Sequence, residues 1–268
     1  MSDFLQQMAT LSAERAAAAG SVRSGDLDKP LAPLRLGGFD IVAEIKGRSP
    51  AEGELAGAGL DRTSRAQDYV RGGAAAISVL TEPSRFDGAL EHLEEVAAAV
   101  PGTPVMRKDF LVEPAQVLEA RKAGASGILL ITAMLSDHKL RAMLDVAYEH
   151  GMFVLLEAFD ENDLARSGVL LENPADYDRA AAGTLLVGVN TRNLRTLEVD
   201  SARLERLAPL LPDARSVAES GLTTPADAAA AAGWGYSLAL VGSALMRSDD
   251  PAALVSSMRE AGGARVAA

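Results

Sequence analysis

The sequence contains no cysteine, which excludes disulfide bonds, thiolate nucleophiles and cysteine-bound zinc. Histidine is scarce too. His92, His138 and His150 lie in helical patterns rather than in spaced pairs, so we expect no metal site. No apolar run approaches the roughly 20 residues that a membrane-spanning helix needs, and no signal-peptide core follows Asp3. We therefore expect a cytoplasmic protein with no membrane partner.

Aromatic residues and positive charge are also in short supply. Only 4% of the 268 residues are aromatic, so Val, Leu, Ile and Ala must fill the core that an apolar fraction of 48% allows. Lys and Arg number 26 against 37 Asp and Glu, a net charge of −11. Such an acidic surface disfavours nucleic acid as a partner, and an anionic substrate would need a local positive pocket. The sequence is compatible with a monomer.

Short apolar runs alternate with helical patterns along most of the chain. Residues 2–19 predict an amphipathic helix, and a linker with two prolines covers 20–38. Eight apolar runs then predict buried strands at 41–45, 75–80, 104–106, 127–131, 153–156, 185–189, 216–218 and 238–241. Helical stripes and caps separate them, with Gly124 and Gly151 as expected C-caps and Thr224-Pro225 as a helix start that ends before Gly233.

Strands separated by helices rather than by hairpin turns require parallel pairing with right-handed crossovers. Eight such units predict an α/β protein, a (β/α)₈ TIM barrel with an N-terminal helical extension. We divide the chain into the extension and linker at 1–40 and a barrel domain at 41–268. An open doubly wound sheet is the alternative, but no glycine-rich dinucleotide motif follows the first strand. Residues 165–184 are interpreted as a helix plus an inserted loop.

Charged and polar residues stand where the predicted strands end, and in a TIM barrel those ends carry the chemistry. Glu44 and Lys46 are two apart, so both should face the barrel axis. Lys108 follows the third strand and is the expected catalytic acid. Buried charges must pair or serve a ligand. The remaining candidates at these ends are Ser49, Phe86, Phe110, Glu157, Asn190, Arg192, Glu219 and Ser220.

Glycines follow the seventh and eighth strands, where barrels commonly bind phosphate. Gly221, Gly242 and Ser243 are the candidates, because backbone N–H groups at these turns supply positive potential. The pattern predicts a phosphorylated small-molecule substrate. The alternative is that these glycines only permit tight turns.

With these residues identified, the sequence resembles the indole-3-glycerol phosphate synthase family from about Ile41 to Met246. Its landmarks begin with Ala43-Glu44-Ile45-Lys46, Ser49-Pro50 and Arg107-Lys108-Asp109-Phe110. They continue with Leu156-Glu157, the segment from Gly188 to Leu194, Ala218-Glu219-Ser220-Gly221 and Val241-Gly242-Ser243.

The resemblance implies a carboxy-lyase of tryptophan biosynthesis. It converts 1-(2-carboxyphenylamino)-1-deoxyribulose 5-phosphate to indole-3-glycerol phosphate, water and carbon dioxide without a metal or cofactor. It further implies that Lys108 is the general acid and Glu157 the base. Lys46 would bind the substrate carboxylate or phosphate and donate the second proton, and Glu44 would orient or assist Lys46. Ser49, Asn190, Glu219 and Ser220 would contact the substrate, and Phe86, Phe110 and Leu194 would line a slot for the anthranilate ring.

The sequence departs from the family pattern after Ser49-Pro50, where Ala51 and Glu52 replace the usual polar residue and lysine. Two other functions stay open. One is another phosphosugar TIM-barrel enzyme. An isomerase of the usual kind needs a cysteine base, and a two-aspartate isomerase would need Asp109, which should point away from the site. A Schiff-base aldolase needs an uncharged lysine, whereas the lysines here have acidic neighbours. A non-catalytic phosphate-ligand-binding paralogue is the other.

Overall fold

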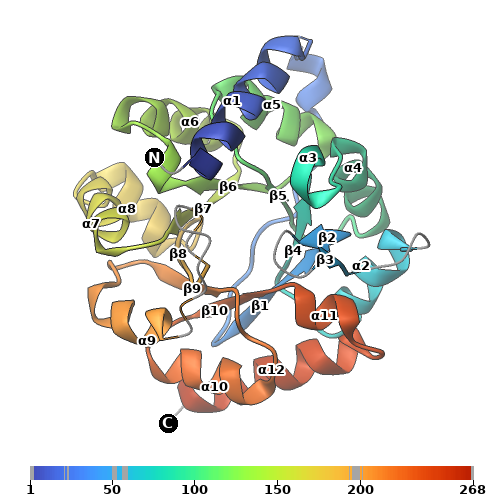
Figure 1. The fold of residues 1–268 in the computed structure, drawn as a ribbon, viewed down its shortest axis with the longest axis vertical. Helices are drawn as coiled ribbons and strands as arrows, with labels where there is room; N and C mark the ends of the chain where they lie inside the picture. The colour runs from blue at the N-terminus through green and yellow to red at the C-terminus, as the bar shows by residue number, and fades with distance from the viewer. Residues whose placement is uncertain are drawn as a thin grey trace.

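The computed structural model describes residues 3–20, 22, 24–49, 53–55, 60–192, 194, 200 and 202–266. Eight parallel strands form a closed barrel in the order β1-β10-β9-β8-β7-β6-β5-β4. Figure 1 looks into the ring of strands, with the helices arranged outside it. The predicted TIM barrel is confirmed. Its strands are β1 (Asp40–Ile45), β4 (Ala76–Leu80), β5 (Val105–Lys108), β6 (Gly127–Ile131), β7 (Phe153–Ala158), β8 (Leu185–Asn190), β9 (Arg215–Glu219) and β10 (Leu238–Val241).

Helices surround the barrel; most connect successive strands, and the last two follow β10. They are α2 (Arg62–Arg71), α3 (Pro83–Phe86), α4 (Leu90–Ala99), α5 (Pro114–Ala123), α6 (Asp137–Glu149), α7 (Glu161–Leu170), α8 (Pro174–Ala181), α9 (Arg203–Leu207), α10 (Pro225–Gly233), α11 (Ser243–Arg247) and α12 (Pro251–Val266). Single 3₁₀ turns are η1 (Ser24–Leu27), η2 (Thr132–Met134) and η3 (Ala208–Leu210). Among the described residues, no helix is both long and apolar enough to cross a membrane.

Local sequence signals explain where several of these helices begin and end. A capping box of Glu113 and Gln116 starts α5, and left-handed Gly124 ends it as predicted. Thr224 caps α10 with Pro225 in its first turn. The prediction that α10 stops before Gly233 is wrong by one residue, because the helix includes Gly233 and Trp234 is its C-cap.

One prediction about the connections is wrong. The segment 165–184 is not a helix plus a loop: α7 is followed by a second helix, α8, because the Asn173 side chain accepts a hydrogen bond from the Ala175 N–H and Pro174 sets the first turn. Among the described residues after β1, β2 (Arg48–Ser49) also pairs antiparallel with β3 (Gly53–Glu54), which was not predicted. Two-residue strands leave no hydrophobic pattern to detect.

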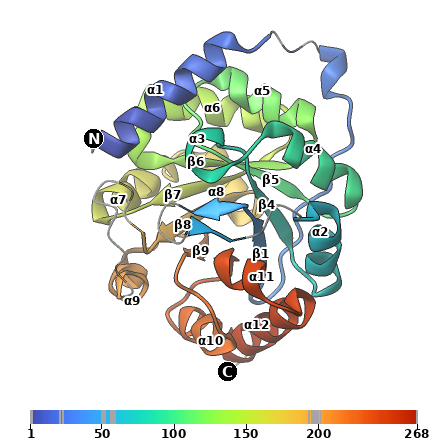
Figure 2. The same ribbon diagram turned by 45° about the vertical axis from the view of Figure 1, so that its right-hand side comes forward.

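The predicted N-terminal helix is α1 (Asp3–Ala18), which lies across the barrel rim beside α5 and α6 (Figures 1 and 2). Its Leu5 and Met8 are fully buried in the same apolar core as the barrel strands. The domain boundary at residue 40 stays a prediction.

Core packing predicts which apolar substitutions destabilise the protein. Leu156 of β7 is fully buried, so Leu156→Ala should lower the free energy of unfolding by about 2–5 kcal/mol through lost burial and a residual cavity. The matched control is Leu210→Ala, since Leu210 is 51% exposed and should change little. Urea unfolding followed by circular dichroism measures both, and equal effects would contradict this account of the core.

Candidate active site

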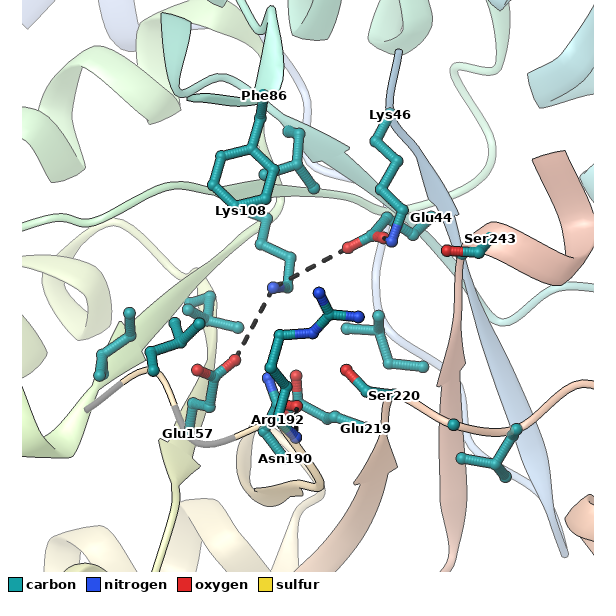
Figure 3. Close-up of a pocket in the computed structure, with 18 of the residues that line it drawn as sticks. Glu44, Lys46, Phe86, Lys108, Glu157, Asn190, Arg192, Glu219, Ser220 and Ser243 are labelled. Carbon is teal, nitrogen blue, oxygen red and sulfur yellow. Dashed lines mark hydrogen bonds and ion pairs between the residues drawn. The ribbon is translucent and has the colours of Figure 1, made fainter. Parts of the chain in front are cut away.

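A cavity of about 350 Å³ lies inside the mouth of the barrel, at the carboxyl ends of the strands. Figure 3 shows charged side chains from several strands converging in it. All of the residues predicted for the site except Ser49 line this cavity. They are Glu44, Lys46, Phe86, Lys108, Phe110, Glu157, Asn190, Arg192, Leu194, Glu219, Ser220, Gly221, Gly242 and Ser243. The backbone of Ser49 lies in β2, while its side chain, like the whole of Ala51 and Glu52, lies outside the described residues.

Lys108, at the end of β5, lies between two carboxylates (Figure 3). Its Nζ is 3.8 Å from Oε1 of Glu44 and 3.7 Å from Oε2 of Glu157. Lys46 Nζ lies 2.6 Å from the other oxygen of Glu44. The two lysines and two glutamates thus form a chain of ion pairs across the cavity. The predicted convergence of residues from β1, β5 and β7 is confirmed.

Opposite charges in this chain shift the pKa values of Lys108 and Glu44 so that their ionised forms are favoured. Burial alone would lower the pKa of Lys108, but the carboxylates of Glu157 and Glu44 raise that pKa above the usual lysine value. Burial alone would raise the pKa of Glu44, but Lys46 and Lys108 outweigh it and hold that pKa below its usual value. Lys108 is therefore an ammonium group at neutral pH, which makes it a potential proton donor and a poor Schiff-base nucleophile.

Glu219, at the end of β9, behaves in the opposite way. Burial and the neighbouring Glu157 raise the pKa of Glu219 well above its usual value. Glu219 is only 1% exposed, so solvent cannot stabilise a second negative charge beside Glu157. Glu219 therefore carries a proton at a pH where Glu44 is ionised.

Two turns complete the cavity beside the last strands. Ser220 and Gly221 both adopt left-handed backbone conformations, with φ of 64° and 78°. This conformation is strained for serine, and such strain concentrates at functional sites. At the next turn, a side chain on Gly242 would overlap the Glu44 carboxylate and lie 2.9 Å from Lys46 Nζ. Gly242 therefore leaves room for the Glu44–Lys46 pair in addition to turning the chain.

Apolar residues line the opposite side of the cavity. The rings of Phe86 and Phe110 lie 6.1 Å apart, and Phe4 of α1 meets Phe110 edge-on at 5.9 Å. Phe4, Leu129 and Ile131 also line the cavity and were not predicted. Alternation along β6 could have identified Leu129 and Ile131, but no sequence pattern places α1 over the barrel mouth.

Asp109 follows Lys108 and is one of the residues that line the cavity, although it was predicted to point away; its side chain is fully buried. Its carboxylate accepts hydrogen bonds from Arg15 at 2.7 Å, from Thr81 and from Arg107. Arg15 also lies 3.7 Å from Glu82, which caps α3. This buried network joins α1 to the ends of β4 and β5. In the described part of the chain, no three His, Asp or Glu side chains are grouped as metal ligands.

Comparison with known proteins bears directly on this site. The family model of indole-3-glycerol phosphate synthase matches residues 15–258. The chain belongs to this family. A relative from Nocardioides sp., named indole-3-glycerol phosphate synthase, is 46% identical over 87% of this chain and 86% of its own length. One from Mycobacterium leprae with the same name is 42% identical over 97% of this chain and 90% of its own.

More distant solved structures share the fold alone. The 3-hexulose-6-phosphate synthase of Salmonella typhimurium superimposes with a TM-score of 0.63 at 17% identity, over 84% of this chain and 99% of that one. The tryptophan synthase alpha subunit of Legionella pneumophila gives 0.54 at 16%, over 83% of this chain and 92% of that one. The family membership therefore rests on sequence similarity, whereas the barrel fold is shared with proteins that have other names.

The contacts of Arg15 predict that α1 is held in place by a partly buried ion pair with Asp109. Because the Asp109 side chain is fully buried, Arg15→Ala should lower the free energy of unfolding by about 1–3 kcal/mol. The control is Arg71→Ala, which breaks a pair with Asp68 in which Arg71 is 65% exposed, and it should leave stability nearly unchanged. Thermal unfolding compares the two, and an equally small effect at Arg15 would contradict the docking role.

Proposed function

We propose that this protein is an indole-3-glycerol phosphate synthase, a carboxy-lyase of tryptophan biosynthesis. It converts 1-(2-carboxyphenylamino)-1-deoxyribulose 5-phosphate to indole-3-glycerol phosphate, carbon dioxide and water. The observation that carries the proposal is the position of Lys108 between the carboxylates of Glu44 and Glu157 at the barrel mouth of a family member.

The first step closes the five-membered ring. The aromatic carbon that bears the carboxylate attacks the ribulose carbonyl carbon, and Lys108 donates a proton to the carbonyl oxygen, which becomes a hydroxyl. The raised pKa of Lys108 supports this role, since the lysine is protonated when substrate arrives. Loss of carbon dioxide then returns the electron pair to the ring and restores its conjugation.

Dehydration completes the reaction and needs an acid and a base on the same intermediate. Glu157 is the proposed base that removes a proton, and Lys46 the donor that protonates the departing hydroxyl as water. Lys46 contacts Glu44 at 2.6 Å, so Glu44 orients its ammonium group. All proton transfers use side chains of the cavity, and we expect no metal or cofactor.

Substrate binding divides between the two sides of the cavity. The apolar side with Phe86, Phe110 and Leu194 suits the anthranilate ring. The turns at Ser220-Gly221 and Gly242-Ser243 suit the phosphate, because their N–H groups can donate to its oxygens. Asn190, Arg192, Glu219 and Ser49 are proposed as further substrate contacts. We also propose a cytoplasmic location. We infer that the protein binds no nucleic acid, because its net charge of −11 disfavours a polyanionic partner.

Two substitutions test the assigned roles. Lys108→Ala and Glu157→Gln should each lower turnover by about 10²–10⁴-fold, because each removes a proton-transfer group. The control is Lys139→Ala, since Lys139 pairs with Glu113 at the surface, away from the cavity. The fluorescence of the indole product reports the rate. Near-normal rates in both site variants would refute the roles even if the wild-type enzyme makes the product.

The same assay distinguishes the other functions that the sequence left open. A non-catalytic paralogue would bind the substrate without producing indole fluorescence. A Schiff-base enzyme would be trapped covalently by borohydride in the presence of substrate, whereas the raised pKa of Lys108 predicts no trapping.

A further inference from the structure

Gly188 of β8 lies at the point where two buried carboxyl groups meet. In the sheet register it stands opposite Glu157 of β7, and β8 pairs on its other side with β9, which ends in Glu219. A Cβ atom on residue 188 would overlap Oε1 of Glu219 and lie 3.1 Å from its Cδ. It would also lie 3.1 Å from the side chain of Leu155. The Glu219 carboxyl group therefore fills the space that any other residue at 188 would occupy.

The two carboxyl groups lack ordinary hydrogen-bond donors. All four oxygens of Glu157 and Glu219 are buried, and within the described part of the chain none accepts a hydrogen bond. The two side chains are nevertheless close enough to bond to each other if one of them carries a proton. A single shared proton supplies the missing donor and removes the repulsion of two buried charges.

We infer that Gly188 is a positioning residue, whose missing side chain lets Glu219 share one proton with Glu157 and so hold Glu157 in place as the base. This inference rests on the proposed function, in which Glu157 removes a proton. The raised pKa of Glu219 agrees with a proton that stays on the pair at neutral pH.

The surroundings of the pair favour one negative charge on it. The charged groups that share the cavity with the pair are Glu44 and Lys46 from the first βα unit, Lys108 from β5, Asp109 directly after it and Arg192 after β8. Asp109 is paired with Arg15 and Arg107. Lys108 Nζ lies 3.7 Å from Glu157 Oε2, which favours ionised Glu157. The pair should therefore act as one unit with two widely separated macroscopic titrations and a broad range of pH in which it holds one proton.

Gly188→Ala tests the inference through the pH profile of turnover. Pushing the carboxyl groups apart removes their coupling, so the acidic limb of the profile should move to higher pH and the basic limb to lower pH, each by about one unit. The rate at the optimum should fall about 10²-fold because the base is misplaced. A structural defect alone would lower the rate without narrowing the profile. The matched control is Gly168→Ala in α7, where a Cβ atom meets no neighbour and the profile should not change.

Infrared spectroscopy provides a test that needs no substrate. Wild-type protein at neutral pH should show the C=O absorption of a protonated, buried carboxyl group, and Glu219→Gln should lack it. In Gly188→Ala the absorption should weaken or shift, with circular dichroism confirming that the variant is folded. If Gly188→Ala does not fold, the comparison of wild type with Glu219→Gln still decides whether a shared proton exists.

The outcomes separate this inference from the proposed function. A wild-type protein without the absorption, or a Gly188→Ala variant with unchanged absorption and an unchanged profile, overturns the inference. A wild-type protein that does not form indole-3-glycerol phosphate overturns the proposed function, and the infrared result still decides the state of the pair.

Discussion

The active-site architecture depends on the ion pairs that Lys108 makes with Glu44 and Glu157. Removing a charge from water costs several kcal/mol for each ion, and a neighbouring opposite charge offsets that cost. Together these side chains compensate one another: Lys108 holds both carboxylates, and Lys46 supports Glu44 from the other side. The rest of the barrel mouth is arranged so that these four groups meet at the required distances.

The closed barrel places these groups through its register and through two glycines. The end of β5 brings Lys108 between β1 and β7, which carry its two partners. Gly242 leaves room for the Glu44–Lys46 pair, and Gly188 leaves room for Glu219 beside Glu157. Each glycine lies next to a carboxyl group from another strand. At both positions the charged groups occupy the space that a side chain would fill, so the packing of the barrel determines how closely these groups can approach.

Much of this arrangement could be predicted from the sequence, because it depends on local patterns. Buried parallel strands are short apolar runs, so all eight barrel strands could be located, two of them, β6 and β10, to the residue. A lysine or glutamate directly after such a run must lie at the barrel mouth, which identifies Lys108, Glu157 and Glu219. The helix α8 is hard to distinguish from a loop because it has only eight residues and because an Asn-Pro dipeptide is also typical of a turn.

Contacts between distant segments could not be predicted in the same way. Phe4 packs against Phe110, and Arg15 bonds to Asp109, only because α1 lies across the barrel rim. The partners in each contact are far apart in the sequence, so no local pattern relates them. Gly188 stood in the motif that carried the family resemblance, but the reason for a glycine there is a carboxyl group from a different strand. Periodicity reports which face of an element is buried, not which atoms fill the space opposite it.

The balance of charge in the cavity explains how an acidic protein can receive an anionic substrate. The described lining contains three cationic side chains, Lys46, Lys108 and Arg192, and three glutamates that can be negative, Glu44, Glu157 and Glu219. Asp109 also lines the cavity, but its carboxylate is paired with Arg15 and Arg107. With all three glutamates ionised, these six groups would cancel, and the field of a protein with net charge −11 would repel a phosphate. A proton retained on Glu219 leaves the cations in excess. The proton that holds Glu157 in place therefore also gives the cavity the local positive potential that substrate binding requires.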